Sequence, residues 1–206
     1  MSRLRRAAVL AFCAHLLAGL SMAVVLRLGL ETTPVLHDRL AFLANHRALW
    51  TGAWLTWTLA AVAILYFYMT FADVHLPTSR LPVMRTVIAL SPDLAAQAIE
   101  IGVLPSLSFA PELFLTLHRV AVMLSGYLAN GLYSVTAIIL AWGARRAYPP
   151  WISGVGLAVG VFGIGLSVSA LLDSASGMFW TNVLLLPSLL IWLAAVGISN
   201  QGRAPM

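Results

Sequence analysis

Residues 151–172 read WISGVGLAVGVFGIGLSVSALL and include no charged side chain. At a rise of about 1.5 Å per residue, a helix of about 20 apolar residues crosses the hydrocarbon core of a bilayer, which is about 30 Å thick. This stretch therefore predicts a transmembrane helix, and the rest of the chain can be compared with it.

Five further apolar runs predict five more spans. The six predicted spans lie near residues 7–27, 49–71, 84–108, 113–142, 151–172 and 178–198. Of the 206 residues, 61% are hydrophobic and only 9% are charged, whereas soluble domains have about 45–50% apolar and about 25% charged residues. This composition excludes a soluble globular domain and leaves no room for a catalytic domain outside the membrane. We predict an all-α polytopic bundle that forms one domain over residues 1–206.

The basic residues predict the orientation of the bundle. All twelve are Arg, and they lie mostly at the ends of apolar runs, which suits membrane topology better than binding to nucleic acid. The side that carries the N-terminus holds eight of them: Arg3, Arg5, Arg6, Arg80, Arg85, Arg145, Arg146 and Arg203. The other side holds three: Arg27, Arg39 and Arg47. Because cytoplasmic loops are rich in Arg, we expect both termini in the cytosol.

The first span and the loop after it each allow two interpretations. Three arginines before an apolar run also fit a signal peptide, but the length of the run and the later spans favour an uncleaved helix. In the loop near residues 28–48, Thr33 and Pro34 are typical of a helix start. Leu36, Leu40 and Leu43 then share one face. We predict a short amphipathic helix on the outer membrane surface, or alternatively a lid over an outer cavity.

The third span carries an unusual polar stripe. Asp93, Gln97 and Glu100 are spaced at i, i+4 and i+7, so they share one helical face. A carboxylate at the centre of a membrane helix costs about 2.5–3.5 kcal/mol on insertion scales, so such groups face protein or water. Ser91-Pro92 before this stripe is typical of a helix start, and it predicts a kink or a break within the span.

The fourth span carries a second polar face at matching depth. Its members are Arg119, Gly126, Asn130 and Tyr133. We predict an intramembrane ion pair between Glu100 and Arg119, and a hydrogen-bonded carboxyl site formed by Asp93 with Asn130 and Tyr133. Together with Gln97, these side chains form a candidate substrate or ion site. Interhelical polar contacts that only hold the helices together are the competing interpretation.

Other side chains extend this hypothesis. His15 in the first span lies at a depth similar to that of Asp93, so a carboxylate and an imidazole there can relay protons. Trp50, Trp54 and Trp57 share one helical face, which can pack on a helix, contact lipid or line a pocket.

Small residues and histidines suggest further contacts. Gly156, Gly160 and Gly163 belong to small-xxx-small patterns, which serve packing within the chain, self-association or docking of another membrane protein. A haem or metal site that joins His118 to His46 or His37 is a weak alternative. His118, His46 and Glu112 are also the candidate acid–base groups of a membrane enzyme, and the cofactor is left open.

Three segments carry a resemblance: Asn45 to Trp50, Ala98 to Pro105, and Gly126 to Tyr133. Through them the chain resembles uncharacterised small polytopic membrane proteins of bacteria. The resemblance implies a six-span bundle in the bacterial inner membrane, but no activity and no functional residue. The residues leave three function classes open. The first is a protein that handles a small solute or protons at the polar faces of the third and fourth spans. The others are a non-catalytic accessory subunit of a larger membrane complex and a membrane-embedded enzyme.

Overall fold

The computed structural model describes residues 1–199, and over these residues it contains helices and no strands. Six of its helical segments are long and apolar enough to cross a membrane: Arg3–Leu28, Arg47–His75, Leu81–Ser106, Pro111–Gly143, Pro150–Leu171 and Ala175–Ile198. The prediction of a multi-pass helical membrane protein is confirmed at this level. Arg203, which entered the charge count, lies outside the described residues, and the orientation stays a prediction.

Three of the spans are single α-helices, while the others contain tighter or wider turns. The regular ones are α3 (Arg47–His75), α7 (Pro150–Leu171) and α8 (Ala175–Ile198). The first span is α1 (Arg3–Val24) followed by the 3₁₀ turn η1 (Leu26–Leu28). The third is α4 (Leu81–Ala98), the π segment η2 (Ile99–Val103) and the 3₁₀ turn η3 (Leu104–Ser106). The fourth is α5 (Pro111–Val122), the π segment η4 (Met123–Ala129) and α6 (Asn130–Gly143).

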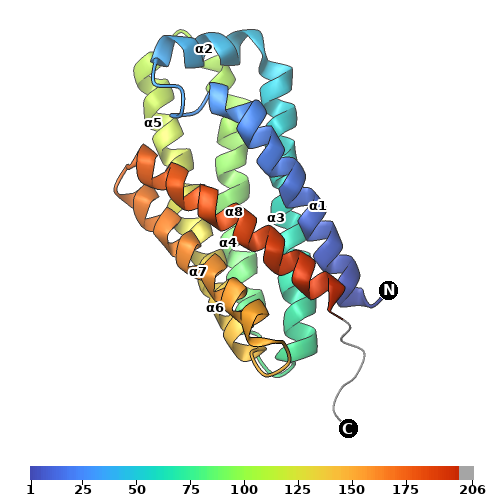
Figure 1. Ribbon diagram of the computed structural model, residues 1–206. Helices are drawn as coiled ribbons and strands as arrows, with labels where there is room; N and C mark the ends of the chain where they lie inside the picture. Colours follow the sequence, from blue (N-terminus) through green and yellow to red (C-terminus); the bar gives the residue numbers. More distant parts are fainter. Residues whose placement is uncertain (200–206) are drawn as a thin grey trace.

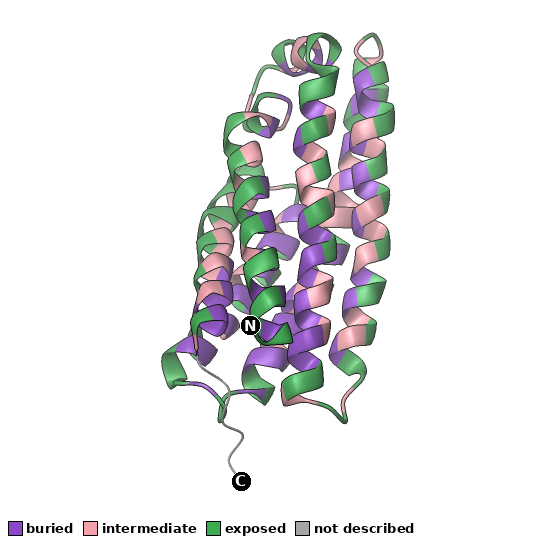
Figure 2. Cartoon of the chain, turned by 90° about the vertical axis from the view of Figure 1, so that its right-hand side faces the viewer, coloured by how far each residue is buried: buried purple, intermediate pink, exposed green. Residues whose placement is uncertain are grey.

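The first and last spans lie against each other. The N-terminus and the end of α8 share one end of the bundle, and the short helix α2 (Leu36–Asn45) lies across the opposite end (Figure 1). Gly197 of α8 lies beside Ala8 of α1. Exposed residues cover the outer faces of the helices, and buried residues face inward (Figure 2).

Two separate clusters of buried side chains hold the bundle together. Near the termini, the ring of Trp192 lies 5.5 Å from the ring of Phe67 and 5.7 Å from that of Phe71. At the opposite end, Trp50 and Phe114 are fully buried in a second cluster. Helix α3 contributes aromatic residues to both clusters, so it links the two ends of the bundle.

Helix α2 differs from its predicted start. Val35 precedes the helix without a side-chain cap, and the Thr33 hydroxyl donates instead to the Arg27 carbonyl at 2.9 Å. Leu40 and Leu43 are buried in the cluster around Trp50, so the apolar face of α2 packs on the bundle. The predicted cap at Thr33 is therefore wrong, although a helix does form here.

The predicted interruption of the third span also lies elsewhere. Helix α4 runs through Pro92 and ends at Ala98, so a helix start at Ser91 is wrong. The chain leaves α-helical geometry at η2, where Glu100 lies.

The glycine face of α7 is occupied within the chain. A Cβ added to Gly160 would lie 2.9 Å from the Ser134 carbonyl of α6, and one on Gly163 would meet the Ser134 side chain. One on Gly156 would lie 2.8 Å from both Ala141 of α6 and Trp192 of α8. The absence of side chains thus lets α6 and α8 approach closely. The three glycines thus serve packing within the chain, one of the predicted roles, and self-association or docking of a partner stays a prediction.

Candidate functional site: a polar column along α4

The π segment η2 exposes a backbone carbonyl inside the bundle. The Leu104 N–H donates to the Ile99 carbonyl, five residues back, so it does not reach the Glu100 carbonyl. Pro105, the next residue, has no N–H to donate. The Trp50 indole N–H of α3 fills this gap with a hydrogen bond of 2.7 Å to the Glu100 carbonyl. Sequence and backbone geometry together therefore require a donor from a neighbouring helix at this point.

The Glu100 side chain is buried and paired with a histidine. Only 2% of Glu100 is exposed, and its Oε1 lies 3.0 Å from Nδ1 of His118 in α5. Its second oxygen, Oε2, is buried without a hydrogen-bond partner among residues 1–199. A buried acceptor without a donor costs about 1–3 kcal/mol, and more when it is charged, so Glu100 is costly to bury.

His118 also faces the loop between α1 and α2. Its Nε2 lies 3.6 Å from Oε1 of Glu31, and its ring stacks on Phe114 at 5.9 Å. The two nitrogens of one buried imidazole are thus directed at two carboxylates. Glu31 is the more accessible of the two, because 30% of its side chain is exposed against 3% for Glu100.

Arg39 of α2 is the fourth ionisable residue in this region. Its Nε donates to the Gly29 carbonyl at 3.0 Å, and its guanidinium lies 5.4 Å from the ring centroid of Phe114. Its Nη2 is buried and has no hydrogen-bond partner within the described chain. Burial lowers the pKa of Arg39, while the Glu31 and Glu100 carboxylates oppose that shift. We call Glu31, Arg39, Glu100 and His118 the α2-end cluster.

Deeper in the bundle, Asp93 forms a second polar group. Ser125 donates to one carboxylate oxygen at 2.7 Å, and Tyr133 lies 3.4 Å from the other. Gln97 also hydrogen-bonds Asp93 and accepts from the Thr58 hydroxyl of α3. Asp93 and Glu100 are seven residues apart, or about 10 Å along the helix. We call the line from Asp93 through Gln97 to the α2-end cluster the polar column.

The structure brings most of the predicted site residues to the column. Asp93 contacts Tyr133 as predicted, whereas Asn130 donates its side-chain amide to the Ser125 carbonyl at 3.0 Å. Asn130 therefore supports the π segment that carries Ser125.

Arg119, however, is not part of the column. Its guanidinium lies 2.7 Å from Asp173 and donates to the carbonyls of Ala170 and Leu171 at the end of α7. The predicted ion pair between Glu100 and Arg119 is wrong, and His118 takes the predicted place of Arg119.

The π segment η4 explains this one-residue error. In an α-helix, residues seven apart share a face, but a π turn adds one residue to that repeat. Ser125 and Tyr133 both contact Asp93 although they are eight apart, and His118 lies seven before Ser125. Arg119 is rotated by about 100° from His118, which directs it toward α7.

His15 lies apart from Asp93. Its Nδ1 is 2.9 Å from the Ala11 carbonyl, and its ring meets Trp57 edge-on at 6.5 Å. Among residues 1–199, no hydrogen bond or ion pair joins His15 to Asp93, and the proton relay between them stays a prediction without a direct contact to support it. The indole N–H groups of Trp54 and Trp57 are buried without a partner in the same range.

The predicted contact of His118 with His46 or His37 is not formed either. His118 is engaged with Glu100 and Glu31, while His46 ends α2 and lies beside Phe42. Within residues 1–199, no group of three or more His, Cys, Asp and Glu side chains is arranged to hold a metal ion.

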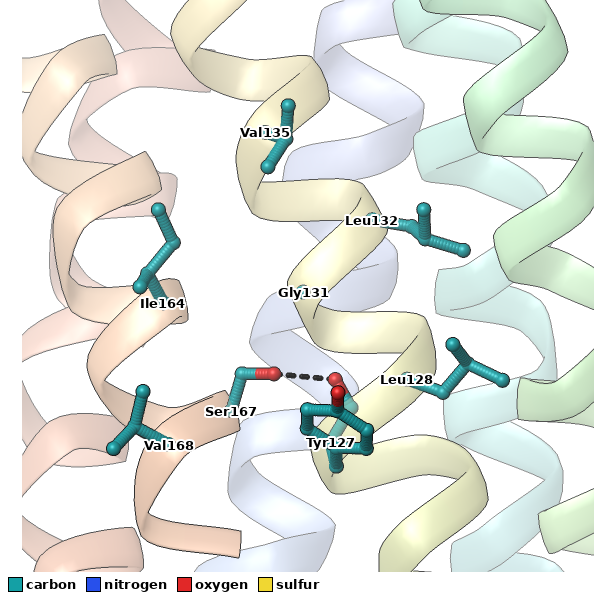
Figure 3. A pocket seen from close by; sticks show the side chains of 8 residues that line it. All are labelled: Tyr127, Leu128, Gly131, Leu132, Val135, Ile164, Ser167 and Val168. Atoms are coloured by element: carbon teal, nitrogen blue, oxygen red, sulfur yellow. Dashed lines mark hydrogen bonds between the residues drawn. The ribbon is translucent and has the colours of Figure 1, made fainter. Parts of the chain in front are cut away.

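A shallow groove lies on a different face, between α7 and the η4–α6 segment. It has a volume of about 370 Å³ and is lined mostly by apolar side chains, including Leu132, Val135 and Ile164 (Figure 3). Ser167 of α7 donates to the Tyr127 carbonyl at its edge. This bond adds a second donor to a carbonyl that also accepts from the Asn130 backbone N–H, so the groove belongs to helix packing rather than to the polar column.

Neither Arg39 nor Glu31 was assigned to the site from the sequence, although the sequence carries a signal for Arg39. Arg39 falls at i+3 from Leu36, so it occupies the same stripe as the leucines that α2 buries. An arginine on the apolar face of a helix indicates a buried partner. Glu31 carries no comparable signal, because only the fold brings its loop over His118.

Comparisons with protein families, with curated proteins and with solved structures found no match to this chain. The arguments about function therefore rest on the geometry of the polar column.

Proposed function

We propose that this protein binds protons in the polar column and moves them along it through the membrane. The observation that supports this function best is the burial of two carboxyl side chains, Asp93 and Glu100, on one face of a membrane-spanning helix. Each carboxyl group contacts side chains that carry an exchangeable proton: Ser125 and Tyr133 contact Asp93, and His118 contacts Glu100. Acidic groups inside membrane segments are costly, and they commonly belong to proton or solute pathways.

Unsatisfied atoms favour this proposal over a purely structural role. A seam that only holds helices together gains most when each polar atom is paired. Here Glu100 Oε2 and the indole N–H groups of Trp54 and Trp57 are buried without partners in the described chain. They lie on α3 and on the α4 span that carries the column, and a small polar solute that pairs with them is the second candidate substrate.

Proton flux into vesicles tests the proposal. The purified protein is reconstituted into vesicles with an internal pH-sensitive dye, and a potassium gradient with valinomycin drives protons inward. We expect flux above that of empty vesicles and a loss of about tenfold or more in Asp93→Asn, because an amide cannot exchange the proton. Asp73→Asn is the matched control, since Asp73 lies outside the column and forms an exposed pair with Arg3.

Two results would refute proton movement along this column. One is wild-type flux no greater than that of empty vesicles. The other is equal flux in Asp93→Asn and Asp73→Asn, with both variants folded.

We further propose a bacterial inner membrane as the location and the cytosol as the side of both termini. More arginines lie on the side of the bundle that carries the N-terminus than on the other side, and this bias supports the orientation. Fusions of a reporter that is active only in the cytosol to the loops near Arg80 and near Arg47 test it. Activity at Arg47 and none at Arg80 would reverse the orientation.

A further inference from the structure

We infer that the α2-end cluster is the access point of the proton path, with His118 relaying protons between Glu31 and Glu100. This inference rests on the proposed function. It gives the side chains of the α2-end cluster a role that is separate from that of Asp93.

Accessibility falls sharply between Glu31 and the two inner groups. The side chain of Glu31 is 30% exposed, that of His118 is 4% exposed, and that of Glu100 is 3% exposed. The imidazole lies between the carboxylates, 3.6 Å from one and 3.0 Å from the other. It uses a different nitrogen toward each of them. A proton that binds Glu31 from water therefore has one imidazole to cross before it reaches the interior carboxylate.

The surroundings of His118 are acidic on both sides of its ring. It contacts Glu31 from the loop and Glu100 from η2, while Phe114 of its own helix covers its ring. Arg39 of α2 is close enough to both carboxylates to interact with them electrostatically. The cluster therefore holds two acids and one guanidinium, and the imidazole lies between the acids.

The transfer consists of two coupled proton movements and needs no oxidant or reductant. The O–H bond of protonated Glu31 breaks and an N–H bond forms at Nε2 of His118. The N–H bond at Nδ1 breaks and an O–H bond forms at Oε1 of Glu100. Tautomer exchange through water then restores the N–H at Nδ1.

Two conservative substitutions test the relay in the vesicle assay. Both Glu31→Gln and His118→Gln retain hydrogen-bonding groups but cannot carry the proton, so we expect flux to fall about tenfold or more in each. His75→Gln is the matched control, because His75 lies near the opposite end of α3 and bonds Tyr148. Full flux in folded Glu31→Gln or His118→Gln would overturn the relay.

Chemical rescue separates a relay from a structural role. In His118→Ala, added imidazole should restore part of the flux, because it fills the space and supplies the exchangeable nitrogens. The same addition should leave Asp93→Asn unchanged. Flux in His118→Ala that imidazole fails to raise, in a protein shown to be folded, would contradict the relay.

A spectroscopic measurement keeps the relay testable without flux. Nitrogen-15 NMR in micelles observes the ring nitrogens of His118, identified by their loss in His118→Gln. The Nε2 resonance should move in Glu31→Gln relative to wild type, because the carboxylate that faces this nitrogen is lost. Identical spectra would overturn the contact. Flux that needs Asp93 but not Glu31 would refute the relay and leave the proposed function standing, whereas absent wild-type flux would refute that function.

Discussion

Both the hairpin from α4 to α6 and the hairpin from α7 to α8 consist of two membrane-spanning segments, but their backbone geometry differs. In the first, both spans contain π segments, and they carry Asp93, Glu100 and His118. In the second, both spans are regular α-helices, and Gly156 and Gly160 bring the neighbouring helices close. The first hairpin holds every acid of the polar column except Glu31.

The contrast shows what a π segment contributes in a membrane. It shifts the backbone ladder, and in lipid a carbonyl left without a backbone donor needs another one. Trp50 of α3 supplies a donor for the Glu100 carbonyl. The Ser125 and Tyr127 carbonyls accept from the Asn130 backbone N–H and gain second donors from the Asn130 side chain and from Ser167 of α7. Bonds from α3 and α7 thus reach the irregular hairpin, where backbone irregularity and polar side chains occur together. The regular hairpin needs only close packing.

The largest effect is expected in the regular hairpin, from Trp192→Ala. Trp192 is 1% exposed and contacts Phe67 and Phe71. Removing its side chain leaves a cavity, and we expect a loss of about 3 kcal/mol, the lower end for Trp→Ala, since lipid rather than water surrounds separated helices. Unfolding by SDS in mixed micelles measures the difference. Trp180→Ala, on the same helix but 62% exposed, is the control and should cost far less.

A somewhat smaller loss is expected from Gly160→Ala. The added methyl group would lie 2.9 Å from the Ser134 carbonyl, which belongs to the backbone of α6 and cannot move aside alone. We expect a loss of about 2 kcal/mol, which is typical of overpacking. Gly154→Ala on the same helix meets nothing within 4 Å and should be neutral or slightly stabilising. Equal stabilities of the two variants would contradict the packing of α7 against α6.

The smallest effect concerns the donor at η2. Trp50→Phe removes the N–H that bonds the Glu100 carbonyl and keeps most of the ring, so we expect a loss of about 1 kcal/mol. Trp54→Phe removes an indole N–H that has no partner in the described chain, so it should cost less than Trp50→Phe. The same unfolding assay compares them. If Trp54→Phe is the more costly variant, the view that η2 depends on a donor from α3 fails.

The sequence was sufficient for the six spans, because apolar length and the absence of charge act locally along each helix. It was also sufficient for the polar face of α4, where Asp93, Gln97 and Glu100 repeat with regular α-helical spacing. It failed at Arg119, where the rotation of α5 depends on an extra residue within η4. A π turn has no reliable local signature, and one inserted residue redirects every side chain on one side of it.

The remaining errors have a tertiary origin. Glu31 approaches His118 only because α2 folds back over the end of the bundle. The glycines of α7 fit either an internal or an external neighbour, and only the full arrangement identifies α6 and α8 as the neighbours. Such choices depend on which surfaces meet, and that information is distributed over the whole chain.

The contact between α1 and α8 has a consequence for biosynthesis. Helix α1 leaves the ribosome well before α8, yet Gly197 rests beside Ala8 in the finished bundle. Until then α1 has only α3 as a long neighbouring helix within the described chain, and one of its flanks stays open to lipid or to an insertion factor. The contact between α1 and α8 can therefore form only after the last helix has been synthesised.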